Sequence, residues 1–181
     1  TNTDAGTTRY TANGAFTTGT TPQDLLEGLI TSMGATLWYT QGAWNVKAAK
    51  WTTTVLDLNE DDLRSGISLA TRHSRRDNFN TVNGTFRGDE SNWQVTDFPP
   101  VTNANFVTID NGEESSIDFD LTFTDNSVEA RRLARIVLER NRQQLAVEAT
   151  FGLRAFQVQT GDNITLTNTR LGWTNKEFEV M

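Results

Sequence analysis

The sequence feature that most constrains the fold is a stretch of helical periodicity at residues 126–143. It is the longest segment without Gly or Pro that keeps this period, and its apolar residues at i, i+3, i+4 and i+7 are Ala130, Leu133, Ala134 and Val137. Asn126 is a suitable N-cap, and Glu129 three residues later would complete a variant of the capping box. We therefore predict a helix of roughly 25 Å that packs its apolar face on neighbouring strands.

A second helix and two hairpins are predicted near the start of the chain. Thr21 is a fit N-cap, Pro22 suits the first helical position, and Gly34 is a natural stop; the predicted buried face is Leu25, Leu26, Leu29, Ile30 and Met33. The first hairpin, at residues 9–17, would turn at Asn13-Gly14. The second, at residues 35–49, would turn at Gln41-Gly42.

Most of the remaining chain reads as short strands separated by polar loops. Residues 115–123 show the clearest alternation of apolar and polar side chains. The other predicted strands are 67–71, 78–87, 106–110, 145–151, 153–158, 163–167 and 178–180. The pattern predicts an α+β fold with two helices packed on mostly antiparallel sheets. We expect a small hairpin–helix–hairpin lobe at 1–50 and a β-rich lobe at 51–181, with one continuous domain as the alternative.

Composition excludes several classes of function. The 181 residues carry a net charge of −7 and contain no cysteine, so thiol chemistry and Cys-ligated zinc are excluded. The acidic balance argues against stable binding to nucleic acid or to anionic membranes, and no apolar run is long enough for a membrane span. The chain does not begin with Met, and we expect it to be a fragment of a longer protein.

No candidate site of catalysis, cofactor binding or metal binding is convincing. His73, the only histidine, stands in an Arg-rich loop typical of a surface. The acidic stretch at 57–68 lacks the Gly and Glu of a calcium loop at the sixth and twelfth positions, where Asp62 and Ser68 stand. Asp118 and Asp120 could serve a glycosidase, but a solvated strand face explains them more simply. We predict no enzyme and no cofactor.

Arginines and tryptophans are the remaining candidates for binding. The basic cluster could face nucleic acid, although pairing with nearby acids is the simpler interpretation; it comprises Arg72, Arg75, Arg76, Arg131, Arg132, Arg135, Arg140 and Arg142. Tryptophans could stack on sugars, although packing in a core or an interface is the default; they are Trp38, Trp44, Trp51, Trp93 and Trp173.

Several stretches, in order along the chain, carry a family resemblance. They are RYTANG (9–14), TPQDLL (21–26), MG (33–34), QGAWNV (41–46), RRDNFNTVNGTF (75–86), DFPPV (97–101), EARRLA (129–134), RNRQ (140–143), and GD (161–162) leading to LGWTNKEFEV (171–180). Together they resemble the tail tip attachment protein J and related hub proteins of long-tailed phages.

The resemblance implies a structural role in a virion. Such hubs form a trimeric ring around the channel at the distal end of the tail, and they bind other tail-tip proteins and the tape measure protein. It implies a β-rich hub domain, a place at the tail tip, and roles in host attachment and genome ejection, with no catalytic residues in this region. Two alternatives stay open: a carbohydrate-binding module and a glycan-cleaving module of a tail or cell-surface protein.

Overall fold

The computed structural model describes residues 9–40, 42–72 and 74–181, and their contacts divide the chain into two compact units. Unit 1 combines residues 9–35 with 74–143, and unit 2 combines residues 36–72 with 144–181. The chain passes between the units three times. Of the lobe predicted at 1–50, the described residues 9–35 lie in unit 1, and residues 36–40 and 42–50 lie in unit 2.

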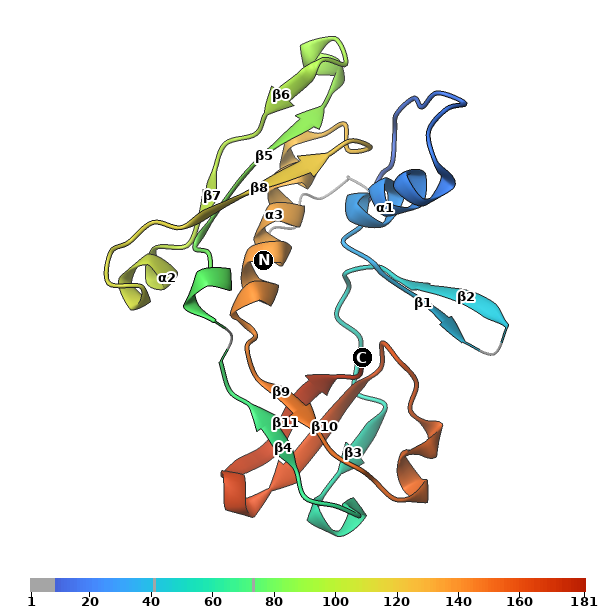
Figure 1. The fold of residues 1–181 in the computed structure, drawn as a ribbon, viewed down its shortest axis with the longest axis vertical. Coiled ribbons are helices and arrows are strands. Elements are labelled where there is room, and N and C mark those ends of the chain that lie inside the picture. Colours follow the sequence, from blue (N-terminus) through green and yellow to red (C-terminus); the bar gives the residue numbers. More distant parts are fainter. Residues whose placement is uncertain (1–8, 41, 73) are drawn as a thin grey trace. The chain divides into compact units, whose positions relative to one another are not determined.

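The sheet of unit 1 is organised around β5 (Thr81–Arg87). One edge of β5 pairs antiparallel with β6 (Val95–Asp97) and then with β7 (Val101–Thr102). The other edge pairs in parallel with β8 (Ser116–Leu121), as Figure 1 shows. Because side chains alternate along a strand, this pairing gives the sheet one apolar face and one polar face.

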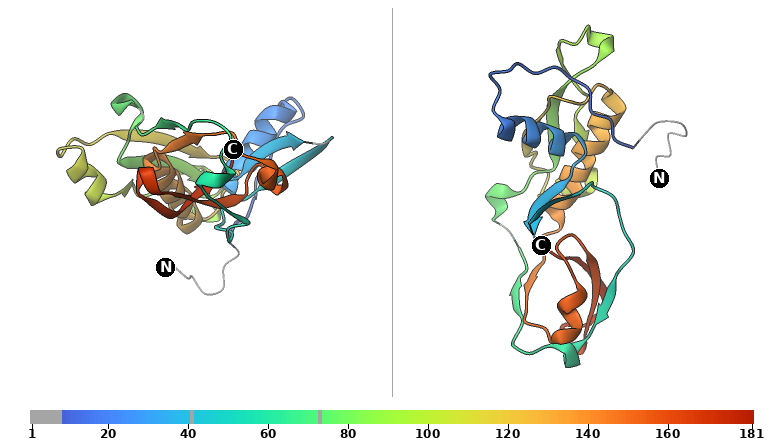
Figure 2. Two further views of the ribbon diagram at one scale, coloured as in Figure 1. Left: turned by 90° about the horizontal axis from the view of Figure 1, so that it is seen from below. Right: turned by 90° about the vertical axis from the view of Figure 1, so that its right-hand side faces the viewer.

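The helix predicted from the 126–143 pattern is present as α3 (Ser127–Arg142), and it covers the apolar face of this sheet (Figure 2). The core between them consists of Val82, Phe86, Phe98, Leu121, Ala130, Leu133, Ala134 and Leu138. Val137 is only half-buried, and Leu138, four residues after the buried Ala134, continues the buried face instead. The Asn126 side chain caps the helix by accepting from Val128 N at 2.8 Å.

The capping-box role predicted for Glu129 is wrong. Its side chain is buried, with 5% exposure, and it turns toward the N-terminal segment. Thr11 donates to it twice, from its backbone N at 2.8 Å and from its Oγ1 at 2.7 Å. The carboxylate therefore ties the start of the described chain to the first turn of α3.

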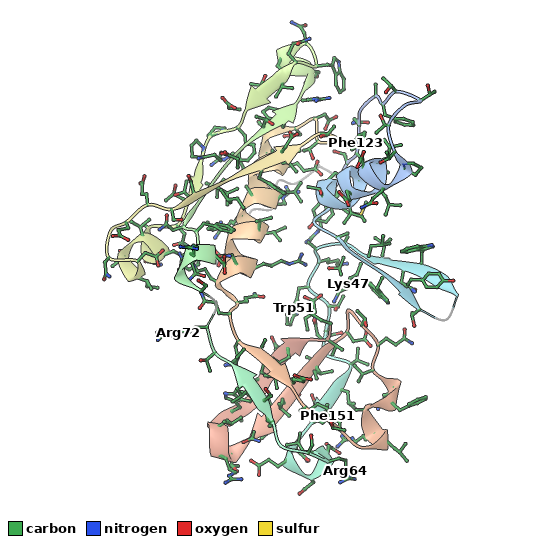
Figure 3. All side chains as sticks on the ribbon, in the orientation of Figure 1. Lys47, Trp51, Arg64, Arg72, Phe123 and Phe151 are labelled. Carbon is green, nitrogen blue, oxygen red and sulfur yellow. The ribbon has the colours of Figure 1, made fainter. Side chains whose placement is uncertain are left out.

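The hairpin predicted around Asn13-Gly14 is also wrong, because this segment is held by tertiary contacts instead of a partner strand. Asn13 N donates to Phe123 O at 2.9 Å, and the Asn13 side chain donates to Asp125. The ring of Phe123 (Figure 3) lies against Gly14 and against Gly28 of α1, where an added Cβ would come within 2.6 Å of it.

The helix α1 (Pro22–Ser32) begins and ends as predicted. Thr21 Oγ1 accepts from Asp24 N at 3.3 Å, and Gly34 follows the helix with a positive φ of 55°. The predicted buried face is only partly correct, because Leu26 and Leu29 are 45% and 42% exposed. The other three members of that face, Leu25, Ile30 and Met33, are half-buried.

The strand predicted at 106–110 is a third helix, α2 (Ala104–Ile109). The Asn103 side chain accepts from Asn105 N at 3.0 Å and so caps a helical turn. Asn111 and Gly112 then reverse the chain with φ values of 62° and 81°. The local capping therefore favours a helix where a short strand was predicted.

Unit 2 contains a three-stranded sheet in the order β11–β10–β3. β10 (Asn163–Asn168) pairs antiparallel with β11 (Trp173–Glu179) and in parallel with β3 (Leu56–Leu58). Two further antiparallel pairs are β4 (Ser68–Ala70) with β9 (Ala146–Glu148), and β1 (Thr36–Thr40) with β2 (Ala43–Lys47). The fully buried apolar core is Leu58, Ile164 and Leu166, with partly buried neighbours such as Phe151, Trp173 and Phe178 around it.

The strand predicted at 153–158 is instead a 3₁₀ helix, Leu153–Gln157. Its turns are closed by Ala155 N donating to Gly152 O and Val158 N donating to Ala155 O, both at 3.0 Å. The strand predicted at 145–151 shortens to β9. Four shorter 3₁₀ turns complete the described chain: Glu60–Asp62, Arg75–Asp77, Asp89–Ser91 and Thr169–Leu171. The α+β class with mostly antiparallel sheets is confirmed.

Candidate functional site

The acidic stretch at 57–68 is part of the framework of unit 2. Asp57 accepts from Thr165 Oγ1, and the 3₁₀ turn that follows is capped by Asn59. Asp62 pairs with Arg154 at 3.2 Å. Over the described ranges, no group of three or more His, Cys, Asp or Glu side chains is placed to hold a metal ion. His73 lies outside the described residues.

Glu60, in the same stretch, accepts hydrogen bonds from the Thr169 side chain and backbone. These bonds favour the ionised carboxylate, with the Thr169 hydroxyl as the largest cause, and they lower the pKa of Glu60 below its usual value. The carboxylate thereby fastens the Thr169–Leu171 turn to the Glu60–Asp62 turn. Its contacts are those of a structural group.

Asp118 and Asp120 lie on the open face of the unit 1 sheet. They belong to a shallow concavity of about 640 Å³, which Asp97 also lines and which has no basic side chain in its lining. Thr85 Oγ1 donates to Asp120 at 2.7 Å. We refer to Asp97, Asp118 and Asp120 as the acidic pocket.

The arginines of α3 divide into two groups. Arg142 is structural, because it forms an ion pair with Asp110, donates to Phe79 O at 2.9 Å and lies over the Phe106 ring at 4.9 Å. Arg140 donates to Gly34 O at 3.0 Å, and Arg132 donates to Arg9 O at 2.8 Å. Pairing with an acid, as predicted for this cluster, is found at Arg142, whereas the bonds of Arg132 and Arg140 named here go to backbone oxygens.

Arg131 and Arg135 form the second group, and both are exposed. Together with Arg132 they line a concavity of about 570 Å³ between α3 and the segment Pro100 to Asn105. Glu139 is the only acidic residue in its lining. We refer to Arg131, Arg132 and Arg135 with their surrounding residues as the basic groove. Arg72 of the predicted basic cluster, which is labelled in Figure 3, belongs to unit 2 and is exposed.

Exposed apolar side chains gather at two places in unit 2. On one face of the β1–β2 hairpin, Tyr39 and Trp44 are cross-strand partners with ring centroids 5.1 Å apart, and they are 61% and 70% exposed. On the 3₁₀ helix, Leu153 and Phe156 are 92% and 89% exposed. Residues three apart eclipse on such a helix, so the two side chains form one apolar knob.

The other tryptophans have mixed surroundings. Trp51 and Trp93 are 62% and 53% exposed, whereas Trp38 and Trp173 are half-buried. Trp173 packs on Phe178 at 5.4 Å between ring centroids. Sequence reasoning singled out the tryptophans but missed the knob. In the strand predicted at 153–158, Leu153 and Phe156 would lie on opposite faces of the sheet and could not form one exposed surface.

Comparisons with known proteins give this arrangement a context. No protein-family model matches the chain. A curated relative, the baseplate hub protein pb3 of Escherichia phage T5, is 23% identical over 155 residues, which are 86% of this chain and 16% of that protein. The chain therefore corresponds to a small part of the relative's length.

Two solved structures share the fold. A chain of the virion of a native gene transfer agent particle matches with a TM-score of 0.70 and 15% identity, over 92% of this chain and 37% of its own length. The 43 kDa tail protein of prophage MuSo2 from Shewanella oneidensis matches with a TM-score of 0.55 and 17% identity, over 89% and 49%. These matches show that the chain shares its fold with a prophage tail protein and with a chain of a gene transfer agent particle. No described helix is long and apolar enough to cross a membrane.

Proposed function

We propose that the chain is a structural component of a phage or prophage tail tip or baseplate hub. The observation that carries the proposal is the sequence match of 86% of the chain to a baseplate hub protein. The shared fold with a prophage tail protein supports it. The particular resemblance to the attachment protein J family belongs to this proposal as well.

In its full-length protein the chain would form part of a homotrimeric ring around the tail channel. Its partners would be other tail-tip proteins and the tape measure protein, its place the tail tip of the virion, and its processes host attachment and genome ejection. A heterologous contact between identical subunits closes into a ring when its rotation is suitable. An acidic channel wall, in keeping with the net charge of −7, would repel DNA phosphates and let the genome pass.

We also propose a structural and not an enzymatic role. The acidic side chains that sequence analysis singled out in unit 2 hold turns together, as Glu60 and Asp62 do. In unit 1, Asp120 is bound by Thr85. These intramolecular contacts explain the carboxylates as groups that stabilise the fold, without a substrate.

Sequencing the DNA that flanks the gene tests the proposal. Tail genes cluster, and a tape measure gene encodes a very long helical protein. We expect such a gene and other tail genes next to this one. Neighbours that encode metabolic or secretion proteins would contradict the proposal.

A second candidate function is glycan binding, which the exposed Tyr39–Trp44 pair favours. Aromatic rings with one open face can stack on sugars, although the two rings are tilted by 58° and do not form a single platform. Tryptophan fluorescence measured against a panel of polysaccharides separates the two candidates. A saturable change that is lost in Trp44→Ala would support glycan binding.

A further inference from the structure

The two concavities of unit 1 carry opposite charge. The basic groove has three arginines and one glutamate in its lining, and the acidic pocket has three aspartates and no base. Both concavities are open and similar in size, at about 570 and 640 Å³. Two surfaces of complementary charge on one protein allow a contact between copies of it, in which one surface of each copy binds the other surface of the next.

Two of the three arginines that define the groove, Arg131 and Arg135, are available for a partner. Within the described part of the chain, the guanidinium groups of Arg131 and Arg135 have no hydrogen-bond or ion-pair partner, although those of Arg140 and Arg142 on the same helix are both bound. Val128, which is 45% exposed, adds an apolar contact beside them. The groove therefore offers two unpaired guanidinium groups next to an apolar side chain.

The carboxylates of the acidic pocket are similarly available. Asp97 and Asp118 are exposed, and their carboxylates have no hydrogen-bond or ion-pair partner within the described part of the chain. Asp120 uses one oxygen to accept from Thr85 Oγ1, which fixes its orientation and leaves its second oxygen for another donor.

The spacing of the charges on the two surfaces also matches. Arg131 and Arg135 are four residues apart on a helix, a rise of about 6 Å. Asp118 and Asp120 are two residues apart on a strand, a rise of about 7 Å. Two guanidinium groups of one copy can thus reach two carboxylates of another copy, and the planar guanidinium pairs with carboxylates through two parallel hydrogen bonds.

We infer that the basic groove of one copy of this chain binds the acidic pocket of a second copy. Pro100 lines both concavities, but the groove lies on the α3 side of the sheet and the pocket on its open side. A contact in which the groove of each copy binds the pocket of the next copy joins two different surfaces and is heterologous. The inference rests on the proposed ring and names the surfaces that would build it.

A nucleic acid is a poorer occupant of the groove. A duplex presents a long row of phosphates, and its binding needs a basic footprint that extends beyond one groove. The chain as a whole has a charge of −7, which repels such a polyanion at longer range. A second copy needs to present only a short acidic surface to the groove, and this matches the limited extent of the groove.

Sedimentation velocity of the 181-residue chain tests the inference through charge exchange. We expect the wild type to self-associate with increasing concentration, and more weakly at high salt. Two variants should weaken this association at least about tenfold, the groove variant Arg131→Glu/Arg135→Glu and the pocket variant Asp118→Arg/Asp120→Arg. Arg170→Glu, an exposed site in unit 2, is the matched control and should associate like the wild type.

The decisive sample is an equimolar mixture of the groove variant and the pocket variant. In the mixture, the reversed groove of one variant faces the reversed pocket of the other, so association should return. Circular dichroism confirms that both variants are folded. A wild type that stays monomeric, or a mixture that stays dissociated, overturns the inference.

Two further readouts separate other outcomes. Binding of a labelled DNA duplex that is lost in the groove variant would assign the groove to nucleic acid and overturn the inference. The genes that flank this one test the proposed function independently. Tail genes as neighbours together with a failed charge exchange would reject these surfaces and leave the tail function in place.

Discussion

The two units differ in how much apolar surface they bury. Unit 1 has eight fully buried apolar residues between α3 and its sheet, whereas unit 2 has three. Among the described residues, eight large apolar side chains of unit 2 are more than half exposed, against four in unit 1. Those of unit 2 are Tyr39, Trp44, Val46, Trp51, Val55, Leu153, Phe156 and Met181, and those of unit 1 are Phe16, Trp93, Val95 and Ile109. The difference indicates that unit 1 supplies most of the stability, and that unit 2 presents apolar surface suited to contact with other proteins.

The largest effect is expected in the core of unit 1. Leu133→Ala removes a side chain with 1% exposure from the centre of α3, and should lower the free energy of unfolding by about 2–5 kcal/mol. Urea denaturation followed by circular dichroism measures it. A loss below about 0.5 kcal/mol would show that α3 does not organise the core.

The equivalent change in unit 2 should cost less. Leu166 is as buried as Leu133, but its core is small and its half-buried neighbours can move into the space. Leu166→Ala should therefore cost about 2 kcal/mol in the same urea experiment. A larger loss than that of Leu133→Ala would reverse the comparison between the units.

A buried polar contact sharpens the comparison on the side of unit 1. Thr11→Val keeps the side-chain shape but removes the hydroxyl that donates to the buried Glu129 carboxylate. The loss of this donor should lower the free energy of unfolding by about 1–3 kcal/mol. Thr17→Val, which alters an exposed hydroxyl, is the control. Equal values for the two variants would mean that Glu129 does not depend on Thr11.

The exposed polar contact of unit 2 should have a smaller effect that depends on pH. The pKa of Glu60 is lowered by Thr169, so the contact stabilises the fold above the unfolded pKa and is lost as pH falls through the folded pKa. Thermal unfolding of wild type and Thr169→Val should differ most at neutral pH and converge in acid. A difference that is constant over this range would show that the Glu60 carboxylate is not involved.

The smallest effect is expected at the apolar knob. Leu153→Ser and Phe156→Ser alter side chains that are about nine-tenths exposed, and each should change the free energy of unfolding by less than about 0.5 kcal/mol. If a partner protein covers the knob, either variant should nevertheless weaken the binding of that protein to this chain. A destabilisation comparable to that of Leu166→Ala would show that these side chains belong to the core.

Sequence periodicity predicted the helices and strands whose capping residues and apolar patterns agree with the contacts that these elements make in the fold. α3 and α1 have both a cap and a spaced apolar face, and the strands β5, β8 and β10 have clear alternation. The errors occurred where a local hydrogen bond decides the conformation. Asn103 starts α2 in a segment that was predicted to be a strand, and Gly152 starts a 3₁₀ helix.

The candidate surfaces were predictable only in part. Sequence analysis identified the arginines of α3 and the Asp118–Asp120 pair, but it could not separate Arg131 and Arg135 from the bound Arg140 and Arg142. That separation depends on residues distant in sequence, such as Asp110. The partner of Glu129, Thr11, is distant for the same reason.

The central claim is that this chain is part of a tail structure. Immunogold electron microscopy of purified particles, with an antibody raised against the chain, tests it most directly. The account predicts gold particles at the distal end of the tail. Label on the capsid, or particles without label in a preparation whose lysate contains the protein, would contradict it.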